Sequence, residues 1–325
     1  MVMDRRKFIG TIAASLIATP LAADAQPVKP AHRIGWLTPE VIENHSRALR
    51  DALRALGYVE GQTVAFETRS ADGDLGQLPK LAAELVQSKV DIILAVTAPG
   101  ILAAKHATDT IPIVMAYWGE NGLIDSGIVA SFAHPGGNVT GVYVLGSELD
   151  GKRVQFLLQA VPKARNVAVL DPGQLFTATD VQNVVQATGI ELRVTTVGTD
   201  RQGYERAFES MAGAHVEALF VPAFPRFVRD APQIIELAAK RRIPAVYEWP
   251  FLAEQGGLMA YGPTPGELEQ RVASFVDRIL KGAKPGDLPV EQPTKFGLVI
   301  NLKTAKALGL TISQSLLLRA DQVIR

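Results

Sequence analysis

Aromatic, acidic and hydroxyl side chains gather where predicted strands end in this sequence. The apolar run IPIVMA, residues 111–116, stops at YWGEN, and the run IPAVYEW ends in a carboxylate and an indole. In open parallel sheets, ligands bind outside the carboxyl ends of the strands. The sequence therefore predicts a binding site at these ends. Its expected ligand contacts are Thr38, Thr97, Ala98, Tyr117, Trp118, Glu120, Asn121, Tyr143, Asp171, Phe224, Glu248, Trp249 and Tyr261.

These side chains suit a zwitterionic, amino-acid-like ligand. Helix N-termini after Thr97 and Asn121 would offer unpaired N–H groups to a carboxylate. Aromatic rings could stack on the ligand or face a cation, although packing at a sheet edge explains any single ring equally well. The carboxylates available for an ammonium group are Glu120, Asp171 and Glu248. The rings available for stacking are Tyr117, Trp118, Phe224 and Trp249.

No pattern in the chain indicates catalysis or a metal site. There is no cysteine, the five histidines lack metal-ligand spacing, and neither G-x-S-x-G nor H-E-x-x-H occurs. GSELDGKR, residues 146–153, approaches a phosphate-binding loop, but Arg153 stands where a Mg²⁺-binding hydroxyl is needed. His45, beside Ser46, is interpreted as part of an exposed helix face. We expect no catalytic residue, no metal and no cofactor.

The elements that position the site alternate along the chain. Short apolar runs, each followed by an amphipathic stretch, predict strand–helix units with helices on both faces of parallel sheets. GLIDSGIVASFA, residues 122–133, is expected to be one of the helices. The expected strands are 33–37, 63–69, 90–96, 111–116, 138–144, 165–170, 190–197, 216–222, 243–249 and 256–262.

The number of units indicates the architecture. Ten units are too many for one small sheet and fit either two doubly wound lobes or a closed barrel. The helix at 147–165 falls mid-chain, as a crossover would, and the two halves repeat one rhythm. We therefore predict an α/β protein of two doubly wound parallel-sheet lobes. The tail, after a Pro-rich segment, adds a strand at 295–301 and a short helix that ends at Gly309.

The N-terminus carries the features of an export signal. Arg5, Arg6 and Lys7 precede a short apolar stretch, and small residues near Ala25 fit cleavage before Gln26. A buried N-terminal helix is the alternative. The arginine pair suggests a twin-arginine signal, but Asp4 departs from it, so the Tat and Sec routes both stay open. We expect a periplasmic protein without stable membrane insertion, whose signal peptide is residues 1–25.

The charge balance excludes other classes of partner. The chain has 33 basic and 33 acidic residues in 325 and shows no basic cluster beyond its first few residues. It therefore predicts no nucleic-acid partner.

The chain resembles the ABC-transporter substrate-binding proteins often labelled tryptophan/tyrosine transport components. The segments that carry the resemblance are LRALGYVEGQTVAFETRSADG, LAAELVQSKVDIILAV, HPGGNVTGV, GGLMAYGP and ILKGAKPGDLPVEQPTKFGLVINLKTAKALGLTI. The resemblance covers nearly all of the chain that follows the expected signal peptide. Three segments depart from the family's pattern: Tyr117–Glu120, Asp171–Gly173 and PAFPRF at 222–227.

The resemblance implies a periplasmic-binding-protein fold with three crossings between lobes and a ligand cleft that closes by hinge motion. The crossings would fall near 143–147, 259–266 and 285–293. One lobe would hold 32–143 plus 264–284, and the other 147–260 plus 290–325. The implied partners are a small-molecule ligand, a permease and its ATPase, and we expect a monomer.

Two other classes of protein compete with a binding protein. A two-lobed periplasmic enzyme could use the same cleft, but it would need an activated nucleophile that the sequence does not display. A repressor with this fold would need an N-terminal helix-turn-helix, but the expected signal peptide occupies that position. The sequence thus favours a non-catalytic binding protein.

Overall fold

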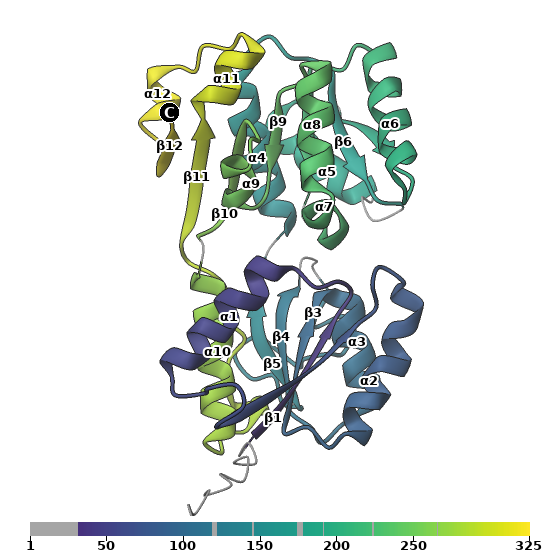
Figure 1. Cartoon of the computed structure of the whole chain (residues 1–325), viewed down its shortest axis with the longest axis vertical. Coiled ribbons are helices and arrows are strands. Elements are labelled where there is room, and N and C mark those ends of the chain that lie inside the picture. Colours follow the sequence, from purple (N-terminus) through teal and green to yellow (C-terminus); the bar gives the residue numbers. More distant parts are fainter. Residues whose placement is uncertain are drawn as a thin grey trace, which may run out of the picture.

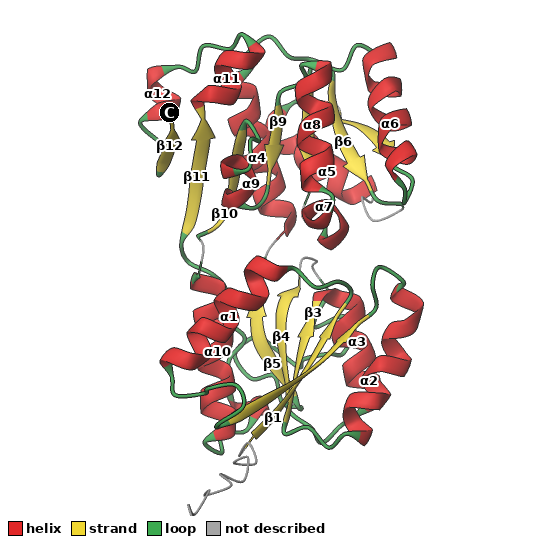
Figure 2. Ribbon diagram, viewed as in Figure 1, coloured by secondary structure: helices red, strands yellow, loops and turns green. Residues whose placement is uncertain are grey.

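The computed structural model describes residues 32–118, 122–144, 146–173, 178–190, 192–222, 224–264 and 266–325. The chain forms two lobes, each an open sheet with helices on both faces (Figures 1 and 2). This confirms the predicted α/β class of two doubly wound lobes and excludes the closed barrel.

Lobe 1 is built on a five-stranded parallel sheet in the order β2-β1-β3-β4-β5. The central strands are buried on both faces, which is why they read as nearly continuous apolar runs. The strands are β1 (His32–Thr38), β2 (Val64–Ser70), β3 (Ile92–Val96), β4 (Ile113–Trp118) and β5 (Val139–Tyr143).

Alternation along β1 distributes its side chains to two layers of helices. Ile34 and Trp36 join the apolar cluster that also holds Leu49 and Leu53 of α1, whereas Leu37 joins the cluster on the opposite face. Helices α1 (Glu43–Ala55) and α10 (Glu267–Leu280) pack together on the first face. The second face is covered by α2 (Leu78–Gln87), which follows the short η1 (Leu75–Gln77), and by α3 (Thr97–Ala107).

Lobe 2 is built on a seven-stranded sheet in the order β12-β11-β10-β9-β8-β6-β7. Its neighbouring strands are parallel except β10 and β11, which pair antiparallel. The strands are β6 (Val167–Asp171), β7 (Leu192–Thr196), β8 (Ala218–Val221), β9 (Ala245–Tyr247), β10 (Met259–Pro263), β11 (Phe296–Asn301) and β12 (Gln322–Ile324).

Helices cover both faces of this sheet too. Apolar side chains of α6, α8 and α9 enter the same cluster as one face of lobe 1, so this layer of core continues from lobe to lobe. Side chains of α4, α5, α11 and α12 form the cluster on the other face. The helices are α4 (Gly146–Ala160), α5 (Ala178–Thr188), α6 (Arg201–Gly213), α7 (Pro225–Arg229), α8 (Ala231–Arg241), α9 (Pro250–Glu254), α11 (Leu302–Leu308) and α12 (Gln314–Leu317).

The chain passes between the lobes three times, as expected. It leaves β5 for α4, returns from β10 to α10, and leaves η2 (Pro285–Asp287) for β11. Glu291, in the last passage, accepts a backbone hydrogen bond from Tyr143 and donates one to Gly141. The precise residue boundaries proposed for the lobes remain predictions.

The expected helix at 122–133 is wrong. The described residues there form turns, closed by hydrogen bonds such as Ser126 N to Gly122 O and Gly127 N to Ile124 O. Gly127 has a φ of 69°, a left-handed conformation that ends a helical turn. The sequence also left α7, α12 and β12 unpredicted, because segments of three to five residues are too short to show a period.

None of the helices in the described part of the chain is long and apolar enough to cross a membrane. The leader, including the expected cleavage near Ala25, lies outside the described residues.

Candidate functional site between the lobes

The two sheets turn the carboxyl ends of their parallel strands toward each other. In Figure 1, β4 and β5 of lobe 1 point toward lobe 2, and β6 of lobe 2 points toward lobe 1. The lobes touch at this level, because the ring of His45 on α1 lies 4.6 Å, centroid to centroid, from that of Trp249. The strand ends at which the sequence predicted a site therefore lie at the interface between the lobes.

Thr97 begins α3 at the end of β3 in a strained conformation. Its φ is 65°, which is costly for a β-branched residue. Its Oγ1 atom is buried and makes no hydrogen bond. The first N–H groups of a helix also have no partner within the helix. Lobe 1 thus presents an unpaired hydroxyl beside a helix N-terminus.

Glu248 follows β9 and is 4% exposed. Its Oε1 lies 3.1 Å from Arg153 Nη2, close enough for an ion pair but without hydrogen-bond geometry, and its Oε2 is buried with no partner. Burial raises the pKa of Glu248 above its usual range, and the charges of Arg153 and His45 oppose that rise. Lobe 2 thus presents a buried carboxylate oxygen that lacks a donor.

Arg153 organises the ends of β9 and β10. It is fully buried on α4, ion-paired with Asp150 at 2.5 Å, and its Nε donates to the carbonyl of Tyr261 at 2.8 Å. In the sequence, Arg153 was noted only because it departs from a phosphate-loop pattern. Its position three residues after Asp150 on a predicted helix could have indicated an ion pair between the two.

His45 is mostly buried, so its interpretation as an exposed helix residue is wrong. Its side chain is 14% exposed, and its Nδ1 lies 2.6 Å from Glu269 Oε1 on α10. A second ring of lobe 2, that of Phe251, lies 5.9 Å away. The sequence did not predict this burial, because Trp249 and Phe251, the residues that cover His45, are about two hundred positions away in sequence.

An ion pair also joins the lobes. Arg229 Nη1, on α7, lies 2.5 Å from Glu40 Oε1, which follows β1. The same guanidinium pairs with Asp230 at 2.7 Å. Burial raises the pKa of Glu40, against the opposing charge of Arg229. Neither Glu40 nor Arg229 was expected at the site.

The other predicted residues of lobe 1 lie at or beside strand ends. Thr38 is buried and donates to the carbonyl of Glu40 at 2.6 Å, and Ala98 lies in the first turn of α3. Tyr143 is 2% exposed and stacks on Phe132 at 5.3 Å. Tyr117 and Trp118 are the last two residues of β4. Glu120 and Asn121 lie outside the described residues.

In lobe 2, Asp171 ends β6, is 4% exposed and accepts a bond from Thr196 Oγ1 at 3.4 Å. Phe224 precedes α7 and lies 5.9 Å from Phe227 in an edge-to-face contact. Tyr261 packs edge-to-face on Phe156 at 5.0 Å. Glu248 and the carbonyl of Tyr261 both contact Arg153, whereas Asp171 and Phe224 follow β6 and β8, further along the sheet edge.

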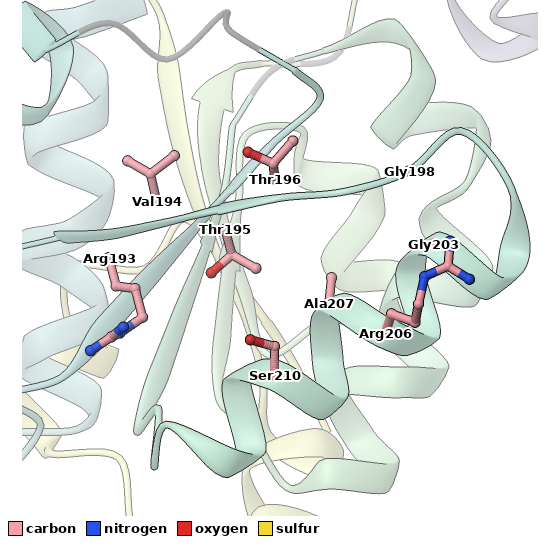
Figure 3. A pocket seen from close by; sticks show the side chains of 9 residues that line it. All are labelled: Arg193, Val194, Thr195, Thr196, Gly198, Gly203, Arg206, Ala207 and Ser210. Carbon is pink, nitrogen blue, oxygen red and sulfur yellow. The ribbon is translucent and has the colours of Figure 1, made fainter.

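A separate hollow lies between β7 and α6 (Figure 3). Its volume is about 330 Å³, and Thr195 points from β7 toward Ser210 of α6. The residues that line it are Arg193, Val194, Thr195, Thr196, Gly198, Gly203, Arg206, Ala207 and Ser210. None of the predicted ligand contacts is among them, so this groove is not the strand-end site.

No group of three histidine or acidic residues within the described ranges could hold a metal ion. The contacts that the interface does show are ion pairs and aromatic contacts.

Two doubly wound lobes that meet at their strand ends, joined by three chain crossings, define the class of two-lobed solute-binding proteins. The chain belongs to the family of ABC transporter substrate-binding proteins, because the sequence profile of that family matches residues 40–324. It is thus the substrate-binding component of an ABC transporter, whose partners are a small-molecule ligand and the transporter itself.

Individual relatives agree with this family. A tyrosine-binding protein of Clostridioides difficile is 26% identical over 268 residues, which are 80% of this chain and 74% of that protein. A domain from Streptococcus pneumoniae, solved in complex with L-Trp, superposes with a TM-score of 0.79 at 24% identity and covers 91% of this chain and 100% of its own. A conserved domain protein of Vibrio cholerae superposes with a TM-score of 0.80 at 23% identity, and the match covers 90% of this chain and 99% of that protein.

Proposed function

We propose that this protein is exported, binds one amino-acid-like molecule between its lobes, and delivers it unchanged to an ABC permease. The observation that carries the ligand class is a pair of buried atoms on opposite lobes that lack partners. Thr97 Oγ1 is a donor beside a helix N-terminus, and Glu248 Oε2 is an acceptor. A buried polar group without a partner is costly, so a ligand that supplies both partners is favoured.

An α-amino acid matches this pair. Its carboxylate would lie at the N-terminus of α3, accept from Thr97 and benefit from the helix dipole. Its ammonium group would donate to Glu248 Oε2 and keep that carboxyl ionised. The remaining predicted polar contacts from the strand ends would complete the site, with Asp171, Glu120 and Asn121 among them.

An aromatic side chain on the ligand is the favoured choice. Trp249 contacts His45 across the interface, and Phe224 lies three residues after the end of β8. Tyr117 and Trp118 end β4 and belong to the same proposed wall. A tyrosine-binding relative and a relative in complex with L-Trp support an aromatic amino acid.

The proposal includes the setting in the cell. Residues 1–25 would be removed on export, and the mature protein would act in the periplasm as a monomer without membrane insertion. The lobes would be residues 32–143 plus 264–284 and residues 147–260 plus 290–325. Closure of the lobes on the ligand would present the closed form to the permease.

The experiment is calorimetric titration of the purified protein with the common amino acids, paired with thermal unfolding. We expect one ligand per chain and a melting temperature that rises with ligand concentration. Thr97→Val keeps the branched shape but removes the hydroxyl, so it should weaken binding about tenfold. Thr195→Val, in the outer groove, is the matched control and should change nothing.

Two outcomes would defeat the proposal. One is an amino-acid panel that leaves the melting temperature unmoved. The other is a change in ligand mass after incubation, which would indicate the enzyme alternative.

A further inference from the structure

Arg226 is a buried cation that forms no ion pair with a carboxylate of the described residues. It is 9% exposed and lies on α7, the helix that follows β8. Only two arginines are buried among the described residues, and the other, Arg153, has both Asp150 and Glu248 within 3.1 Å. Arg226 has no ion pair with any residue of the described ranges.

The contacts that Arg226 does make leave its guanidinium under-used. Its Nη2 donates to the carbonyls of Pro172 and Val197 over long distances of 3.4 and 3.3 Å. Its Nε is buried with no acceptor. The rings of Tyr204 and Phe227 lie 5.9 and 5.7 Å from its Cζ, which stabilises the charge in part.

A buried charge without a counterion is unfavourable, and a guanidinium presents a rigid fork of donors that fits a carboxylate. An anion at Arg226 would accept from Nε and balance the charge. The unpaired donor therefore indicates a binding role more specific than packing.

The position of Arg226 fits a contact with a ligand held between the lobes. The two carbonyls that it contacts follow directly after β6 and β7, at the carboxyl edge of the sheet. Three residues further along the same short helix, Arg229 reaches Glu40 of lobe 1. Helix α7 therefore lies at the interface, and Arg226 lies on its lobe 2 side.

We propose that Arg226 binds a second anionic group of the ligand, so that the natural ligand is an amino acid with a negatively charged side chain. This inference rests on the proposed function. The α-carboxylate would occupy the α3 N-terminus, the ammonium group Glu248, and the side-chain carboxylate Arg226. The two negative groups of the ligand would then face the α3 N-terminus and Arg226, and its one positive group would face Glu248.

The test uses pairs of ligands that differ only in this charge. The pairs are L-glutamate with L-glutamine, and 4-carboxy-L-phenylalanine with 4-carbamoyl-L-phenylalanine. Affinity is measured by calorimetry for the wild type, Arg226→Gln, Arg226→Lys and the control Arg193→Gln. Arg193 is an exposed arginine of the outer groove. The measured quantity is the affinity ratio of acid to amide within one pair.

In at least one pair, the wild type should bind the acid at least tenfold more tightly than the amide. Arg226→Gln should bring that ratio to about one, Arg226→Lys should give an intermediate ratio because it keeps the charge but loses the fork, and Arg193→Gln should leave it unchanged. A purely structural role would lower the melting temperature of Arg226→Gln without changing the ratio.

A wild-type affinity ratio of acid to amide that stays below ten in both pairs overturns the inference, even if the variants fail to fold. So does a ratio that survives in Arg226→Gln. If only neutral amino acids bound tightly, the proposed function would be supported, but the proposal of a second anionic group on the ligand would be wrong. Failure of every amino acid to bind would overturn both.

Discussion

Glu40 and Arg229 are 189 positions apart in sequence and form an ion pair between the two lobes, with Arg229 Nη1 2.5 Å from Glu40 Oε1. Glu40 is largely buried, whereas Arg229 is 42% exposed. The pair exists only while the lobes face each other closely. It therefore favours the approach of the lobes over their separation.

Arg229→Gln should weaken ligand binding, because the closed arrangement loses this pair. A partly exposed ion pair contributes about 1 kcal/mol, which corresponds to about a fivefold loss of affinity. The radius of gyration in solution scattering should also rise in the absence of ligand. Arg201→Gln, which removes exposed pairs within lobe 2, is the control and should leave both quantities unchanged. Equal effects of the two variants would contradict an interlobe role.

Glu248 should make stability depend on pH. Because burial raises its pKa in the folded state, the folded protein keeps this proton to a higher pH than the unfolded chain. Between the two pKa values the folded state binds more protons, so its stability falls as pH rises.

Glu248→Gln removes this titration while keeping the shape. The free energy of unfolding of Glu248→Gln, relative to the wild type, should therefore increase as the pH rises from the usual range of a glutamate toward 8. Urea denaturation of both proteins at pH 4.5, 6 and 8 measures the difference. A difference that is constant across this range, or that changes in the opposite direction, would refute the assignment.

Arg153→Met should destabilise lobe 2 strongly. The substitution leaves Asp150 and Glu248 without their buried cation, and breaking a buried pair in this way costs about 3–5 kcal/mol. Adding Glu248→Gln should recover part of that loss, because one uncompensated charge disappears. Arg201→Met, which breaks only exposed pairs, should cost less than about 1 kcal/mol. Urea denaturation checks all four proteins, and a double variant no more stable than Arg153→Met would contradict the network.

Gly141→Ala should disturb the end of β4. Gly141 has a φ of 135°, and a Cβ there would lie 2.3 Å from the carbonyl oxygen of Met115. The pairing of β4 with β5 changes register between Met115 and Trp118, so the close approach at Gly141 shapes this strand end. We expect a loss of about 2–3 kcal/mol of stability. Gly137→Ala has open space around it and should be nearly neutral. The two unfolding curves decide the matter.

The architecture of this protein was predictable from its sequence because the pattern is local. Each of the ten expected strands has a counterpart in the structure, from β1 to β10, and the strand expected at 295–301 is β11. The short helix ends as expected at Gly309, whose φ is 75°. Apolar runs and their periods are set by neighbouring residues, so they can be read without knowing the fold.

For the candidate site, the sequence predicted only which strand ends meet. The rule that ligands bind at the carboxyl ends of parallel strands pointed to Thr97 and Glu248, and the structure shows a buried polar atom without a partner in each. Their contact with a ligand stays a prediction. The failed helix at 122–133 marks the limit of the periodic pattern, because the conformation of Gly127 ends it.

By itself, the sequence determined the order of the strands from β1 to β11, the two-lobed class and the strand ends that meet. Only the tertiary structure decided which charges find partners. Arg153 pairs with Glu248, which is 95 residues away in sequence, and Arg229 pairs with Glu40 in the other lobe. Arg226 is buried and pairs with no carboxylate in the part of the chain that the structure describes. The reason is physical: periodicity depends on adjacent residues, whereas ion pairing and burial depend on distances that exist only once the chain has folded.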